Sequence, residues 1–398
     1  MSNIRRMPNV RTERTARKRK KRVRIEYFDY SLLAVIIFLM CFGLVMLFSA
    51  SSYGAMIKYG DSMYYFKRQM IFCVMGLVGM RVVVKMDYHV FAKFAKRFYW
   101  ISIFLMALVQ TPLGVEVNGA RRWLKFPIIP QFQPSEFAKI AVIIFIPFVI
   151  CQMGKEAHSI NGMLKAFAWG ALASGCVLIL TENLSTAIIV MGISCILIFV
   201  VHPKTAPFML FVALVAAGAI FLIWTLSNMI ENAGEIDNFR LRRVVVWLDP
   251  ERYAADWGYQ TLQGLYAIGS GGFFGKGLGN SAQKMVIPEA QNDMILSIIC
   301  EELGVFGAII VLTLFGIMLY RLMFIAQNAP DIYGALIATG IFSHIAIQVI
   351  LNVAVVTNTI PNTGITLPFI SYGGTSLLFL MAEMGIALSI SRKIKLEQ

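Results

Sequence analysis

The sequence predicts an all-α polytopic membrane protein, and two observations support this prediction. The 398-residue chain is 58% hydrophobic with a mean hydropathy of +0.69, and its apolar runs lack the regular polar positions of soluble amphipathic helices. No Asp, Glu, Lys, Arg or His interrupts residues 30–50, which form the clearest run. Because about 20 residues of helix cross the roughly 30 Å hydrocarbon layer, we expect this run to span a membrane.

About ten apolar segments are candidate transmembrane helices, and the shorter ones are expected to tilt or to lean on their neighbours. They lie near residues 30–50, 69–84, 98–113, 137–153, 164–180, 186–201, 206–226, 292–320, 332–356 and 366–390. The first is not expected to be a cleaved signal peptide, because a long polar tail precedes it. An even number of crossings returns the C-terminus to the side of the N-terminus. Basic residues at both ends place that side in the cytoplasm.

Residues 1–29 form a basic tail with eleven Lys and Arg against three acids, a net +8 out of +14 for the whole chain. Such a run also occurs in nucleic-acid-binding segments. Next to a membrane span, however, basic residues hold that end in the cytoplasm and lie against anionic lipid, which we favour. We predict a disordered cytoplasmic tail over 1–29 and a single transmembrane domain over 30–398.

Two loops on the extracellular side carry positive charge. The short loop 113–136 contains Arg121, Arg122 and Lys125, against the usual cytoplasmic bias of basic residues. The segment 227–291 is the only long extracellular loop, between the seventh and eighth spans, and it contains six Lys and Arg. Positive charge on this face is consistent with an anionic ligand there.

Two carboxylates begin the stretch VIPEAQNDMILSIICEELG (286–304). Pro288 suits a first helical position, so we predict a helix that starts there, with Glu289 in its first turn and Asp293 four residues on, on the same face. The helix macrodipole explains Glu289, but its effect fades before Asp293. An ionisable side chain at the membrane boundary is a functional candidate, which makes Asp293 the first choice for a catalytic group.

Glu301 and Glu302 lie two to three turns deeper in the same apolar region. There they need counter-ions or a polar cavity. We expect the basic residues of the short loop, or Lys139, to be their partners. Structural ion pairing explains these two acids at least as well as chemistry does.

The segment QFQPSEFAKIAVIIF (131–145) opens another span. Ser135 suits an N-cap, with Glu136 in the first turn. Glu136 and Lys139 are three residues apart, so an intrahelical ion pair is the simpler interpretation. The alternative is that Lys139 faces a polar cavity, where it balances Asp293 or binds an anionic ligand.

Two segments are rich in glycine. GSGGFFGKGLGN (269–280) lacks the strand–loop–helix context of a phosphate-binding loop, so we predict a flexible extracellular loop with backbone N–H groups free to meet a ligand. PNTGITLPFISYGGTS (361–376) interrupts an apolar region with proline and glycine. Irregular backbone at membrane depth survives only when it is buried or lines a cavity, so we predict a broken segment beside a site, with Ser371 and Tyr372 offering hydroxyls.

Other polar residues in the spans have simpler explanations. His344 and Glu383 each stand alone in a span, and we expect them to be satisfied packing residues. The six cysteines lack the paired spacing of metal sites or disulfide frameworks, so we expect them to be small buried residues.

Seven ordered motifs cover nearly all of the chain after the tail. They are DYSLL (29–33), MLFSASSY (46–53), NGARRWL (118–124), QPSEFAK (133–139), WGYQTLQGLYAIGSGGFFGKGLGNSAQKM (257–285), PEAQNDMILSIICEELG (288–304) and PNTGITLPFISYGGTS (361–376). Together they closely resemble the SEDS family of bacterial membrane proteins (shape, elongation, division and sporulation). WLDP (247–250), SAQK (281–284) and TLPFISYGGTS (366–376) are most similar to its division branch, with the elongation and sporulation branches as close relatives.

Two positions depart from the family pattern. TENLSTA (181–187) has Asn183 where the family usually has Asp, so this position is not counted as a carboxylate site. PEAQND (288–293) lacks the family's His but keeps Glu289 and Asp293.

The resemblance implies a peptidoglycan glycosyltransferase that polymerises lipid II at the outer face of the bacterial cytoplasmic membrane, at the division septum. It implies a class B penicillin-binding protein (a transpeptidase) and other divisome proteins as partners, and it implies Asp293 as the essential acid. We expect Asp293 to be the general base of an inverting transfer. The candidate substrate-binding residues are Arg121, Arg122, Trp123, Glu136, Lys139, Lys284, Glu289, Ser371, Tyr372 and Gly373.

No cofactor is certain, although a divalent cation (Mg²⁺ or Mn²⁺) is compatible with the pyrophosphate of the substrate. No cluster of metal ligands marks a site in the sequence. Two other functions also fit intramembrane charge: a lipid II flippase that uses the same cavity without chemistry, and a scaffold for the division machinery.

Overall fold

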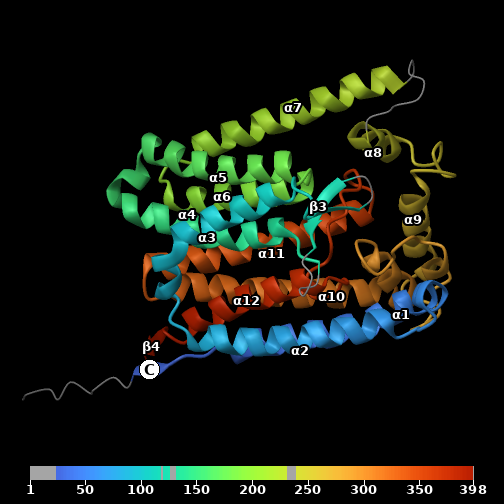
Figure 1. The fold of residues 1–398 in the computed structure, drawn as a ribbon, viewed down its shortest axis with the longest axis horizontal. Helices are drawn as coiled ribbons and strands as arrows, with labels where there is room; N and C mark the ends of the chain where they lie inside the picture. The colour runs from blue at the N-terminus through green and yellow to red at the C-terminus, as the bar shows by residue number, and fades with distance from the viewer. Residues whose placement is uncertain (1–23, 118–119, 126–130, 231–238, 398) are drawn as a thin grey trace, which may run out of the picture.

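The protein is a bundle of long helices in the computed structural model, which describes residues 24–117, 120–125, 131–230 and 239–397 (Figure 1). Three predicted spans (98–113, 292–320 and 366–390) extend beyond their helix, but each predicted span overlaps one of ten long helices in the described residues. These helices are α1 (Tyr30–Tyr59), α2 (Tyr64–Lys85), α3 (His89–Leu108), α4 (Pro134–Met153), α5 (Ile160–Leu180), α6 (Leu184–Val201), α7 (Ala206–Ile230), α10 (Ile295–Asn328), α11 (Ile332–Val356) and α12 (Gly374–Ser391). The prediction of an all-α polytopic membrane protein is confirmed.

Eight helices of the described residues are each long and apolar enough to cross a membrane. The pair α2 and α3 meets the criterion together, with a bend of 120° between them, and would bring the number to nine if it were one span. Both helices, however, lie along helices that span: α2 packs along α12, and α3 packs along α4. We therefore infer that α2 and α3 each cross, which agrees with the expected number of about ten.

The two ends of the described chain lie side by side. Strand β1 (Arg24–Glu26), just before α1, pairs antiparallel with β4 (Lys395–Glu397), just after α12. Adjacent ends require an even number of crossings, as ten helices give. The pairing also shows that the last residues of the predicted disordered tail are ordered. Residues 1–23 of that tail lie outside the described residues.

The long connection between α7 and α10 carries helices of its own. These are α8 (Phe239–Leu248), α9 (Tyr259–Gly271) and the short 3₁₀ helix η2 (Gln283–Met285). They lie at the end of the bundle opposite to the paired termini, on the right in Figure 1. We call this end the loop end. The hairpin β2 (Gly114–Val117) and β3 (Ala120–Leu124) connects α3 with α4, and another 3₁₀ helix, η1 (Gly154–His158), follows α4.

Burial is distributed as expected for a protein surrounded by lipid. The interior between α1, α4, α6, α10, α11 and α12 is filled with fully buried Ile, Leu, Val and Met side chains. Large apolar side chains also cover much of the outer face, and α7 contributes several, among them Met209 and Phe221. An outer surface of this kind is stable against hydrocarbon and unfavourable in water.

Candidate active site

Asp293 lies at the loop end, two residues before the first residue of α10. The predicted helix start at Pro288 is therefore wrong. Residues 286–294 form turns, and Glu289 has a φ of +49°, which a helix does not allow. Glu289 and Asp293 consequently do not stack on one helical face. Asp293 is buried, with 9% of its surface exposed, whereas Glu289 is exposed.

Amide side chains hold the Asp293 segment in place. Gln260 of α9 donates from Nε2 to Asp293 Oδ1 at 3.3 Å and to the Pro288 carbonyl at the same distance. Asn352 of α11 donates from Nδ2 to the Asp293 carbonyl at 2.9 Å and to the Ile365 carbonyl at 2.7 Å. The Asn352 bonds join the Asp293 segment to the broken segment 361–376, which the sequence places beside a site.

Burial raises the pKa of Asp293 from its ordinary value of 3.8 to about 6. The charge of Arg243 opposes this rise and the charge of Glu289 adds to it. A carboxylate with a pKa near 6 is ionised at neutral pH and still accepts a proton readily, which is the behaviour that a general base needs.

Arg243 supplies positive charge that acts on Asp293, and Arg122 supplies positive charge that acts on Arg243. Arg243 of α8 donates from Nη1 to the Asn362 carbonyl at 3.0 Å, and burial together with the charge of Arg122 lowers its pKa. Arg122 of β3 donates to the Glu182 carbonyl at 3.2 Å. Two guanidinium groups that repel each other in this way form a site that an anion would stabilise.

The other predicted residues of the hairpin face elsewhere. Arg121 is exposed and lies 3.8 Å from Glu116, its neighbour across the hairpin. Because successive residues of a strand point to opposite sides, Arg121 points away from the side that Arg122 faces. Trp123 is partly buried and pairs with Val115 in the same hairpin.

Lys139 is buried and paired, as the simpler interpretation predicted. Its Nζ lies 3.0 Å from Glu136 Oε2 and donates to Gln348 Oε1 at 3.3 Å. The same Gln348 oxygen lies 2.8 Å from His344 Nε2, and His344 Nδ1 lies 2.7 Å from Glu383 Oε2. His344 and Glu383 are therefore partners of each other, in a polar chain that joins α4, α11 and α12.

The glycine-rich segment 269–280 is not a flexible loop, contrary to the prediction. It enters a break in α10, where Gly304 has a φ of +71°. Four backbone hydrogen bonds join the loop to the break: Lys276 N to Glu301 O and Gly277 N to Glu302 O at 2.9 Å each, and Val305 N to Gly272 O and Phe306 N to Phe273 O at 3.0 Å each. Two loop N–H groups that were expected to be free thus satisfy the orphan carbonyls of a helix end.

Glu301 and Glu302 form ion pairs with the long loop, and the predicted partners were wrong. Glu301 pairs with Lys276 at 2.7 Å, and Glu302 with Lys284 at 3.4 Å. Both carboxylates are fully buried. The ammonium group of Lys284, a predicted substrate contact, is directed into this cluster.

The remaining candidates, Ser371, Tyr372 and Gly373, lie in the broken segment 361–376. Ser371 is buried, and its hydroxyl accepts the Leu367 N–H at 2.8 Å, which closes a turn. The N–H of Tyr372 donates to the Gln291 carbonyl at 2.9 Å, and the N–H of Gly373 donates to Gln69 at 3.3 Å. Backbone contacts therefore tie this broken segment to the Asp293 segment and to α2.

A cavity of about 230 Å³ opens at the loop end between α1, the start of α2 and the segment 284–291. Its polar lining comes from two lysines, two tyrosines, a carboxylate and an amide: Lys58, Lys284, Tyr53, Tyr65, Glu289 and Gln291. Tyrosine faces with charged and amide groups can bind a sugar that carries an anionic substituent.

The sequence model of the FtsW/RodA/SpoVE family, described as cell cycle proteins, matches residues 30–396. The chain belongs to this family. It is 37% identical to stage V sporulation protein E of Bacillus subtilis, over 92% of this chain and 97% of that protein. It is 34% identical to the probable peptidoglycan glycosyltransferase FtsW of Geobacter sp. (strain M18), over 94% of this chain and 99% of that protein.

Solved structures of the family share the fold. A chain of a peptidoglycan synthase complex, whose description refers to coordinated polymerization and crosslinking, matches with a TM-score of 0.75 and 25% identity, over 92% of this chain and 98% of that chain. The rod shape determining protein RodA of Thermus thermophilus matches with a TM-score of 0.63 and 24% identity, over 92% and 97% of the two chains. This FtsW/RodA/SpoVE chain is thus a multi-pass membrane protein of known fold.

Sequence reasoning missed three residues of the site in this family member: Arg243, Gln260 and Asn352. Arg243 was one of six basic residues in a long loop, and nothing local distinguishes it from the others. Asn352 had a signal, since it and Gln348 are the two amide side chains of an apolar span, and such residues usually form hydrogen bonds within the bundle.

Proposed function

We propose that this protein is a peptidoglycan glycosyltransferase that polymerises lipid II at the outer face of the bacterial cytoplasmic membrane. The observation that supports this most is the buried Asp293 carboxylate at the loop end, whose pKa is about 6 and whose charge interacts with that of Arg243. Arg243 in turn interacts with the charge of Arg122. A base and a cationic site at the membrane boundary match a substrate that joins a sugar to a lipid through pyrophosphate. The family relatives named peptidoglycan glycosyltransferase support the same activity.

In the proposed reaction, Asp293 removes the proton from the 4-hydroxyl of the acceptor's GlcNAc. The oxygen attacks the anomeric carbon of the terminal MurNAc of the growing chain, and the bond from that carbon to the lipid pyrophosphate breaks. One displacement converts the α-linked donor into a β-linked product, so a single base suffices. Gln260 and Asn352 orient Asp293 through its carboxylate and its carbonyl.

Arg243 and Arg122 are proposed to stabilise the pyrophosphate as it leaves with its extra negative charge. Within the described ranges no three His, Cys, Asp or Glu side chains come together as a metal site. We therefore assign no step to a protein-held metal. A divalent cation would be carried by the phosphates of the substrate, and polymerisation in EDTA tests this.

We further propose that the protein acts at the division septum together with a class B penicillin-binding protein. Support comes from the matched chain of a complex that couples polymerization to crosslinking, and from the division-type motifs of the sequence. Relatives named for division and for sporulation match at 34% and 37% identity, so copurification of the partner transpeptidase from dividing and sporulating cells decides between these stages.

The decisive experiment measures glycan polymerisation from lipid II by the purified protein with its partner. Asp293→Asn is expected to lower the rate about 10²–10⁴-fold, the usual contribution of a general base. Asp249→Asn, an exposed carboxylate of the same long connection, is the matched control and keeps activity. Polymerisation that survives Asp293→Asn refutes the base assignment. If the wild type makes no polymer but moves lipid II across the membrane of vesicles, the protein is a flippase instead.

A further inference from the structure

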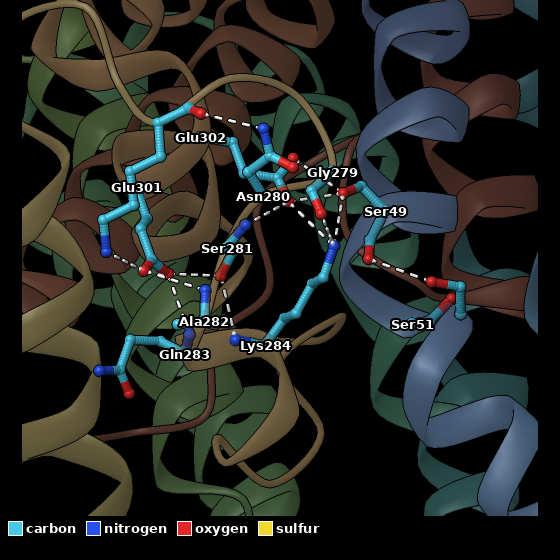
Figure 2. Close-up of polar contacts among 12 residues, drawn as sticks. Ser49, Ser51, Gly279, Asn280, Ser281, Ala282, Gln283, Lys284, Glu301 and Glu302 are labelled. Atoms are coloured by element: carbon cyan, nitrogen blue, oxygen red, sulfur yellow. Dashed lines mark hydrogen bonds and ion pairs between the residues drawn. The ribbon is translucent and has the colours of Figure 1, made fainter.

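Figure 2 shows the cluster of polar contacts around Glu301 and Glu302. Hydrogen bonds from residues 281–283 to Glu301 close a ring of chain, and Asp293 lies within that ring. We call this cluster the carboxylate clamp, and it consists of Ser49, Lys276, Ser281, Lys284, Glu301 and Glu302. The general-base mechanism does not use these residues. Their burial nevertheless demands an explanation, because placing two adjacent carboxylates inside a protein is unfavourable unless both are fully paired.

Glu301 ties the chain before Asp293 to the helix after it. Its carboxylate accepts hydrogen bonds from the Ser281 hydroxyl and from the backbone N–H groups of Ala282 at 3.1 Å and Gln283 at 3.2 Å. Those N–H groups stand at the start of η2. Since Glu301 belongs to the first turns of α10, both ends of the segment 284–294 are attached to the same short piece of helix.

Glu302 fastens this ring to α1. The Ser49 hydroxyl lies 2.6 Å and 2.8 Å from its two oxygens, and Lys284 Nζ lies 3.4 Å away. Lys284 also donates to the Gly279 carbonyl at 2.6 Å, and Figure 2 shows its side chain extending between the loop and α1. The cavity of about 230 Å³ has α1 as one wall and the segment 284–291 as another, so this contact also sets its width.

The carboxylate clamp contributes more to the arrangement of the segment that carries Asp293 than to the stability of the folded protein. Replacing a buried ion pair with apolar side chains is often neutral or stabilising, so stability alone gives little reason to keep four charged groups here. Directional hydrogen bonds from hydroxyl, ammonium and backbone N–H groups, in contrast, define one arrangement of the segment. The four charged groups also sum to zero, so the clamp adds no net charge to the region of Asp293.

We propose that Glu301 and Glu302 are positioning residues for the glycosyl transfer: they hold the segment 286–294, and with it Asp293, against α1 and α10. This inference rests on the proposed function for its kinetic consequence. Its structural consequence, an ordered segment 286–294, is independent of any activity.

The experiment compares Glu301→Gln and Glu302→Gln with Asp29→Asn in the full-length protein with its partner. Asp29 is a matched control, because it is fully buried and paired with Arg321 at 2.8 Å, but it lies at the terminal end of the bundle. Hydrogen exchange of amides 286–294 is expected to become faster by about tenfold or more in the two Gln variants and to stay unchanged in the control.

Kinetics supply the second readout. A displacement of about 1 Å in a catalytic group costs up to about 10²-fold in rate, so kcat should fall about ten- to a hundredfold while KM changes much less. The midpoint of the pH–rate profile should move below its wild-type value, because a loosened segment exposes Asp293 to water. In Asp29→Asn the midpoint should stay in place.

Three results would overturn the proposal. One is unchanged exchange of 286–294 in both Gln variants, and another is an unchanged kcat and pH midpoint in variants that fold. The third result applies if the Gln variants fail to fold. In that case Ser281→Ala and Lys276→Gln, which each remove one contact to Glu301, are measured in the same way. Exchange of 286–294 at the wild-type rate in both of these variants would overturn the proposal. If the wild type makes no polymer, the proposed function fails, and exchange alone decides the role of the clamp.

Discussion

The Asn352 side chain lies within hydrogen-bond distance of the Asp293 carbonyl, at 2.9 Å, and in this way connects the last turns of α11 to the candidate base. The same amide group bonds to Ile365 in the broken segment. One buried side chain therefore holds together two irregular stretches that are about 70 residues apart and that both border the site.

Asn352→Leu tests this connection. Two buried carbonyls would lose their donor, and each unsatisfied group costs about 1–3 kcal/mol, so we expect the free energy of unfolding to fall by about 2–6 kcal/mol. Polymerisation should fall more than that of Asn328→Ala, a control at the opposite end of α10. Thermal unfolding in detergent and lipid II polymerisation measure the two effects, and wild-type activity in Asn352→Leu would contradict the prediction.

The pH dependence of polymerisation reports the state of Asp293. A base with a pKa of about 6 is protonated below that value, so kcat/KM should fall about tenfold for each pH unit below pH 6 and level off above pH 7. A profile whose acid limb has its midpoint near 4 would mean that the carboxylate is solvated during turnover. The measurement needs saturating partner, so that only the transferase titrates.

Asp293 should also make the protein less stable at neutral pH than at acidic pH. Its folded pKa of about 6 lies above its ordinary 3.8, so the stability it contributes is complete below pH 3.8 and is lost as the pH rises through 6. Two pKa units correspond to about 3 kcal/mol, so Asp293→Asn should be more stable than the wild type at pH 8 by up to about that amount. The two proteins should unfold alike near pH 4. Equal stability at both pH values would show that the carboxylate is not desolvated.

Arg243→Gln is expected to change both the rate and the pH profile. Loss of a guanidinium that stabilises the leaving pyrophosphate should lower kcat/KM about 10²–10³-fold. Because the charge of Arg243 holds the pKa of Asp293 down, the midpoint of the acid limb should move above 6. Arg252→Gln, an exposed arginine of the same connection, serves as the control with wild-type behaviour. A rate loss without the upward shift would separate the leaving-group role from the effect on Asp293.

Local sequence patterns predicted much of this architecture, because crossing a bilayer imposes a length and a composition on each helix separately. They also identified Asp293, whose charge is conspicuous at a membrane boundary, and the Glu136–Lys139 pair, whose spacing is local. The helix break at Gly304 and the partners of Glu301 and Glu302 depend on a loop that lies 18 to 33 residues earlier in the chain. Pairing between such distant segments leaves no periodic signal, so the helix was expected to begin at Pro288 and the loop to be flexible.

Gly304→Ala tests the inserted loop most directly. A Cβ at this position would collide with the carbonyl oxygen of Phe273, and the φ of +71° is itself unfavourable for alanine. We expect a severe loss of folded protein, because the loop would have to leave the break and expose the carbonyls of Glu301 and Glu302. Gly316→Ala on the same helix is the matched control: open space surrounds that position, and alanine should stabilise the helix by up to about 1 kcal/mol. If both variants unfold alike, the loop does not occupy the break, and the basis of the carboxylate clamp is lost.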